Sequence, residues 1–150
     1  MAEYLYNAVQ AVQLNQPALF ENSIPCNRGN VYHENETGIF ILRGNTQNCF
    51  AQYQVTFNGN IAVPEGGTAG VPIAVSIALN GEPRLTSRAI FTPAAVDQYG
   101  NVTSTAIVRV PRGCCFSLSL RAVPGTDDPA ATPAPVINVQ NANLTIVRTA

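Results

Sequence analysis

Apolar and polar residues alternate one by one over long parts of this chain, and this period of two constrains the fold most strongly. In residues 51–58 the apolar set is Ala51, Tyr53, Val55 and Phe57, with Gln52, Gln54, Thr56 and Asn58 between them. Residues 71–79 carry valine, isoleucine or leucine at every second position. Successive side chains of a β-strand point to opposite faces, so both segments are predicted to be half-buried strands.

Turn residues separate further segments of the same kind. Four more strands are predicted at Leu85–Phe91, Thr103–Val110, Cys114–Val123 and Val136–Val147. Asn58-Gly59 is a hairpin signal before Ile61, and Asn80-Gly81 is a second one. The four prolines of residues 124–135 predict an exposed loop rather than a domain linker.

The N-terminal segment Tyr4–Leu14 permits two interpretations. Leu5, Ala8, Val9 and Val12 could line one face of a helix. The β pattern of the rest of the chain favours strand instead. Residues 1–30 are therefore expected to supply the first strands or an attachment arm.

About eight to ten short strands, with turns between them and no internal repeat, predict an all-β fold. The favoured architecture is a two-sheet antiparallel jelly-roll sandwich, with residues 1–150 as a single domain.

Charged residues are scarce in this chain. Charged residues make up 11% of it, whereas an ordinary soluble domain has about 25%. This predicts that part of the surface is covered by another subunit. A net charge of −1 offers no basic field for nucleic acid, and no apolar run approaches the roughly 18 residues of a membrane span. The start at Met1 has no pattern of a secretory signal peptide, so none is expected.

Eight arginines and no lysine supply the positive charge. The rigid guanidinium suits two-point contacts across an interface, and Arg109 and Arg121 are the candidates because they lie in apolar strands. Tyr53 and Phe57 are predicted as further interface residues.

Cys26, Cys49, Cys114 and Cys115 contain no Cys-x-x-Cys pair, so no zinc or thioredoxin-like site is expected. Strand alternation places Cys114 with Phe116 on the core face and Cys115 on the other face. Two interpretations stay open. The four cysteines form disulfides within or between subunits, or they are buried, reduced thiols.

No pattern predicts catalysis, a metal or a cofactor. His33 is the single histidine, and no Gly-x-Ser-x-Gly turn presents a nucleophile to it. Asp127-Asp128 lacks the spacing of a calcium loop, so it is expected to be a solvated loop tip.

Several segments in order resemble a known family. They are Glu36-Thr37-Gly38-Ile39-Phe40, the hairpin at residues 77–83, strands at 104–110 and 116–120, and the closing strand at residues 143–148. Together they resemble the C-terminal domains of collagen-like exosporium glycoproteins of spore formers, which are relatives of TNF and complement-type globular jelly rolls. The resemblance implies a ten-stranded jelly roll that forms a homotrimer. Unlike that family, this sequence has no collagen-like stalk.

These observations lead to a non-enzymatic assembly protein that binds copies of itself and other particle proteins. A virion decoration or head-fibre protein is favoured, and a spore-surface protein is the alternative. Both would be made in the cytoplasm and released by lysis. A competing hypothesis is a receptor- or glycan-binding module that uses loops 65–71, 92–102 and 124–135, in which Tyr99 is the single aromatic residue.

Overall fold

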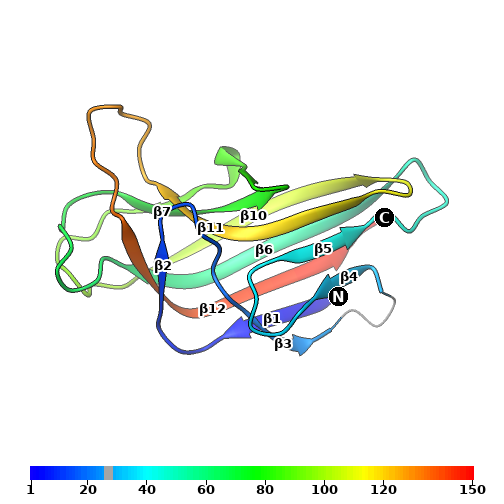
Figure 1. Ribbon diagram of the computed structural model, residues 1–150, viewed down its shortest axis with the longest axis horizontal. Helices are drawn as coiled ribbons and strands as arrows, with labels where there is room; N and C mark the ends of the chain where they lie inside the picture. The colour runs from blue at the N-terminus through cyan, green and yellow to red at the C-terminus, as the bar shows by residue number, and fades with distance from the viewer. Residues whose placement is uncertain (26–28) are drawn as a thin grey trace.

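The computed structural model describes residues 1–25 and 29–150, and strands dominate this part of the chain (Figure 1). The strands are β1 (Ala2–Tyr6), β2 (Gln10–Gln13), β3 (Glu21–Ile24), β4 (Val31–His33), β5 (Phe40–Arg43), β6 (Phe50–Ala62), β7 (Ile73–Leu79), β8 (Glu82–Pro83), β9 (Ala89–Phe91), β10 (Gly100–Pro111), β11 (Cys115–Pro124) and β12 (Val136–Arg148). The 3-10 turn η1 (Leu85–Ser87) is the helical element of the described residues. The number of strands in the described residues exceeds the expected eight to ten because several of them are only two to four residues long.

The strands form two antiparallel sheets. In the first sheet the order is β10-β6-β12-β1-β3, and β2 pairs with β12. In the second sheet the order is β4-β5-β11-β7-β8, and β9 pairs with β7. The prediction of an all-β, two-sheet antiparallel fold is confirmed. The N-terminal segment contributes β1 and β2 to the first sheet, so strand was the correct interpretation for residues 4–14.

The hairpin predicted at Asn58-Gly59 is wrong. Strand β6 runs through this dipeptide without interruption, and Gly59 lies opposite Val102 in the register with β10. A Cβ atom built on Gly59 would lie 2.6 Å from Cζ of Phe57. Glycine at this position therefore makes room for a neighbouring ring and does not form a turn.

The second hairpin signal is confirmed. Asn80 and Gly81 have φ angles of 52° and 84°, which is the backbone that a tight turn of primed type requires. They connect β7 to β8. The predicted strand at Leu85–Phe91 is shorter than expected, because its first residues form η1 and only Ala89–Phe91 pair with β7.

The apolar core lies between the two sheets. Tyr53 and Phe57 have no exposed surface and belong to this core. The Tyr53 hydroxyl donates to the Arg43 carbonyl at 2.6 Å and lies 3.2 Å from the Asn30 carbonyl. The prediction that these two aromatic residues form a subunit interface is therefore wrong, since their side chains are enclosed by their own chain.

Candidate interaction surfaces

On β10, β6, β12 and β1, the outer face of the first sheet is almost without charge; on the edge strand β3, Glu21 is exposed and lies opposite Leu5. Its outward-facing side chains on β10, β6, β12 and β1 alternate with the buried core positions. They are Asn101, Thr103, Thr105, Ile107, Arg109, Gln52, Gln54, Thr56, Asn58, Asn60, Asn138, Gln140, Asn143, Thr145, Val147, Glu3 and Leu5. Within this set, which the structure describes completely, only Arg109 and Glu3 carry charge. We call this surface the charge-poor face.

Neutral side chains lie level with one another across the charge-poor face. Thr105 and Thr145 both lie opposite Thr56, one from each neighbouring strand. In another row, the Asn101 amide donates to Oδ1 of Asn58 at 3.0 Å and to Oδ1 of Asn60 at 3.1 Å. Amide and hydroxyl groups can both donate and accept hydrogen bonds. A second protein surface could therefore cover this face without burying an unpaired charge.

The two arginines predicted at an interface have different environments. Arg109 lies on the charge-poor face, where its guanidinium sits 4.9 Å from the Phe50 ring centroid and its Nε donates to Gln52. Arg121 lies on β11 of the second sheet and donates to the Asn15 carbonyl at 2.9 Å and to Ser119 at 3.1 Å. Arg109 thus remains a candidate contact residue, whereas Arg121 makes its polar contacts within the chain.

The cysteines that the structure describes are exposed. Cys49, Cys114 and Cys115 all carry free, exposed thiols, and Cys26 lies outside the described residues. Cys114 was expected in the core, but it lies in the turn before β11, which follows Gly113 with a φ of 77°. For these three residues, the interpretation as buried thiols is wrong.

His33 lies in the core and not in a cleft. Its ring stacks on Phe40 with centroids 4.1 Å apart, and Nε2 lies 2.8 Å from the Thr37 carbonyl. Nδ1 contacts the side-chain amide of Asn22. Burial lowers the pKa of His33 below its usual value of 6.5, and the hydrogen bond with Thr37 opposes this shift. The position therefore favours the neutral imidazole.

We expect the stability of the protein to fall in acid because of His33. The unfolded chain takes up this proton below about pH 6.5, before the folded chain does, so the free energy of unfolding decreases as the pH falls below that value. Urea denaturation at neutral pH and at roughly pH 5.5, which is above the range of ordinary carboxylates, measures the effect. His33→Gln should flatten the dependence. An equally steep dependence in that variant would contradict this assignment.

The three loops of the competing hypothesis meet at one end of the sandwich. The Gly70 amide donates to the Pro93 carbonyl and the Asp97 amide to the Val63 carbonyl, each at 2.8 Å. Arg88 forms two hydrogen bonds with Asp127, at 2.9 and 3.2 Å, which fix the loop at 124–135 and lower the pKa of Asp127. A cavity of about 410 Å³ lies between residues 63–71 and 132–136, and valine and proline dominate its lining.

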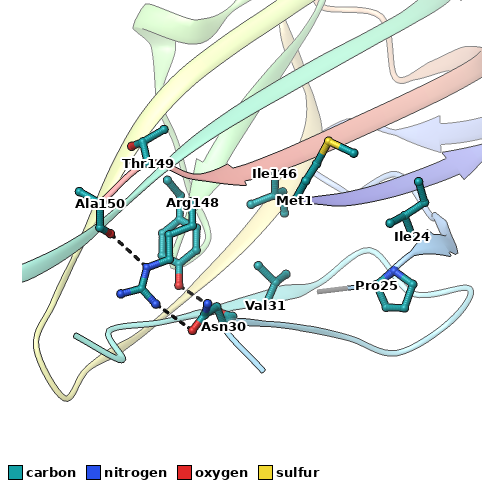
Figure 2. A pocket seen from close by; sticks show the side chains of 10 residues that line it. Met1, Ile24, Pro25, Asn30, Val31, Ile146, Arg148, Thr149 and Ala150 are labelled. Atoms are coloured by element: carbon teal, nitrogen blue, oxygen red, sulfur yellow. Dashed lines mark hydrogen bonds between the residues drawn. The ribbon is translucent and has the colours of Figure 1, made fainter. Parts of the chain in front are cut away.

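A second hollow, of about 510 Å³, lies where the chain termini meet (Figure 2). Arg148 points into it, but its guanidinium donates to Asn30 Oδ1 at 2.9 Å, to the Asn45 carbonyl at 2.6 Å and to the Ala150 carbonyl at 3.1 Å. These bonds join the end of β12 to segments next to the second sheet. Arg148 therefore has a structural role here.

In the part of the chain that the structure describes, no group of three or more histidine, cysteine, aspartate or glutamate side chains is arranged to hold a metal ion. No helix in the same residues has the length and apolar character needed to cross a membrane.

Comparisons with known proteins support the fold. No model of a known protein family matches the sequence, and no curated protein matches it. The structure is similar to an Eiger TNF from S. frugiperda, with a TM-score of 0.63 and 12% identity over 99% of this chain and 92% of the other. It is also similar to the globular domain of a zebrafish complement 1qA protein, with a TM-score of 0.56 and 14% identity over 99% and 97%. A murine APRIL structure gives a TM-score of 0.55 and 9% identity over 96% and 98%. The chain thus has the jelly-roll fold of TNF and complement 1q domains.

Proposed function

We propose that this protein is a non-enzymatic structural protein that forms homotrimers on the surface of an extracellular particle. The observation that carries the proposal is the charge-poor face, whose seventeen outward-facing residues include two with charge. Solvent-exposed sheet faces normally carry charged side chains that keep a protein soluble and prevent association. A face of amides and hydroxyls is better suited to contact with copies of the same chain.

The particle is proposed to be a virion, with the chain as a decoration or head-fibre protein, and a spore surface is the alternative. The sequence motifs that resemble spore-surface jelly rolls support display on a particle. Immunogold labelling of purified virions and spores from the source tests the location. Labelled particle surfaces are expected. Detection of the chain only in the soluble fraction of the cells would contradict the proposal.

A second candidate function is recognition of a glycan by the end of the sandwich where loops 65–71, 92–102 and 124–135 lie, which we call the loop end. The cavity between residues 63–71 and 132–136 favours it, because an apolar floor that includes Val71 lies beside Thr68, Thr132 and Glu65. Apolar groups can cover the C–H face of a sugar, while hydroxyl and carboxylate groups bond its hydroxyls.

A glycan array with the wild-type protein and Val71→Arg tests this candidate. Selective binding that is lost in the variant would establish the loop end as a glycan site. Retained binding in Val71→Arg, or binding to no glycan, would exclude this cavity as the site. Thr92→Glu lies in the adjacent loop outside the cavity lining and serves as the control that should bind like the wild type.

A further inference from the structure

Three exposed thiols lie on neighbouring connections at one end of the sandwich. Cys49 ends the connection between β5 and β6, and Cys114 lies in the turn between β10 and β11. The two connections are joined by hydrogen bonds from the Arg112 amide to the Cys49 carbonyl at 2.9 Å and from the Gly44 amide to the Cys114 carbonyl at 2.8 Å. Figure 1 shows both connections at the end where the C-terminus lies. We call Cys49, Cys114 and Cys115 the thiol end.

The exposure of these three cysteines is unusual for their residue type. A cysteine without a disulfide is among the residues most often buried, because it behaves as a small apolar side chain. All three side chains of the thiol end are exposed and therefore contribute little to packing. Exposed thiols are accessible to oxidation and to disulfide exchange.

The thiol end adjoins the charge-poor face. Cys49 directly precedes β6, and the turn with Cys114 directly follows β10, so both residues lie at the edge where two strands of that face end. Cys115 differs from them. It is the first residue of β11, and since Phe116 packs on the core, the Cys115 side chain lies on the outer face of the second sheet.

We propose that the thiol end is a covalent clasp, in which Cys49 of one copy forms a disulfide with Cys114 of the next copy. The proposal rests on the homotrimer proposed above. Subunits around a three-fold axis meet head to tail, so each contact joins two different positions of the chain. Two distinct cysteines per chain can therefore close a ring of three disulfides. A bond between two copies of the same cysteine would join only two of the three chains.

The chemistry needs an oxidant, and a small-molecule disulfide such as glutathione disulfide is sufficient. One cysteine loses its proton and attacks the oxidant, which releases one glutathione and leaves a mixed disulfide. The second cysteine, also deprotonated, attacks the protein sulfur of that mixed disulfide and releases the second glutathione. Each clasp thus consumes one glutathione disulfide and yields two glutathione molecules. Reducing cytoplasm keeps the thiols free during assembly, and an oxidising exterior closes the clasp.

Denaturing electrophoresis without reductant tests the clasp. Reduced protein is incubated with glutathione disulfide and then alkylated before it is denatured. We expect the wild type to migrate at three times the 15.9 kDa of one chain. Cys49→Ser and Cys114→Ser should each reduce the covalent trimer to the single-chain band. Cys115→Ser is the matched control that should keep it.

Three results would overturn the clasp. In the first, the wild type stays at the single-chain mass, whether its thiols are free, joined in an internal disulfide or bound to glutathione. In the second, the covalent trimer survives Cys114→Ser. In the third, the cross-linked species stop at two chains. Light scattering of the reduced protein distinguishes failure of the clasp from failure of the proposed trimer. If the reduced protein is a trimer but no covalent trimer forms on oxidation, only the clasp is contradicted. If the reduced protein is a monomer, the proposed homotrimer is contradicted.

Discussion

Thr56→Glu is expected to dissociate the protein into single chains. Thr56 is on β6, in the interior of the charge-poor face, between Thr105 on β10 and Thr145 on β12. A glutamate here would place a carboxylate from every copy in a contact whose single positive side chain, Arg109, lies opposite Gln52 and not opposite Thr56. An unpaired buried charge costs about 3–5 kcal/mol, and every 1.4 kcal/mol weakens association about tenfold. Light scattering should show the mass falling from three chains to one.

Two control variants separate charge from the loss of threonine. Thr56→Val keeps the shape of the side chain and adds no charge, so it should retain the oligomer. Thr92→Glu adds the same charge at an exposed position of the loop after β9, which is not part of the charge-poor face, and should also retain it. If Thr56→Glu associates as strongly as these controls, the charge-poor face is not the contact between copies.

Phe57→Ala is expected to lower the free energy of unfolding by about 3–5 kcal/mol, the usual cost of emptying a buried aromatic site. The side chain has no exposed surface, and its ring covers Gly59 on the same strand. For a chain of 150 residues, each kilocalorie corresponds to about 2–4 °C in the melting temperature. Thermal unfolding by circular dichroism should therefore show a drop of roughly 10 °C.

Tyr32→Ala is the matched control for this prediction. Tyr32 is also aromatic and lies on a strand, but 53% of its surface is exposed, so its truncation should change the melting temperature by much less. The two variants also test whether Phe57 is a core residue or an interface residue. A Phe57→Ala protein that loses its oligomer but keeps the stability of its single chain would contradict the core assignment.

The strands were predictable because a sheet covered on one side leaves a period of two in its sequence. The alternation in residues 51–58 identified which side chains share a face, and β6 is indeed a strand. It could not identify which partner covers the apolar face. Tyr53 and Phe57 were therefore assigned to a contact between chains, although the second sheet of the same chain covers them. The candidate contact surface between copies is formed instead by the intervening residues, whose neutral side chains make up most of the charge-poor face.

The errors arose where tertiary contacts overrule a local signal. Asn58-Gly59 has the composition of a hairpin, but glycine there accommodates the Phe57 ring. Cys114 was assigned to a strand, but the turn around Gly113 continues through it and exposes its thiol. Proline and glycine identified the three long loops, and no local pattern could show that residues 63–71 and 132–136 enclose one cavity.

The central claim is that copies of this chain associate through the charge-poor face, and the mass of the reduced wild-type protein in solution tests it most directly. Reductant excludes disulfides, so the measurement reports the non-covalent contact alone. Light scattering at low micromolar concentration should give three times the 15.9 kDa of one chain. A mass of 15.9 kDa under the same conditions would contradict the account.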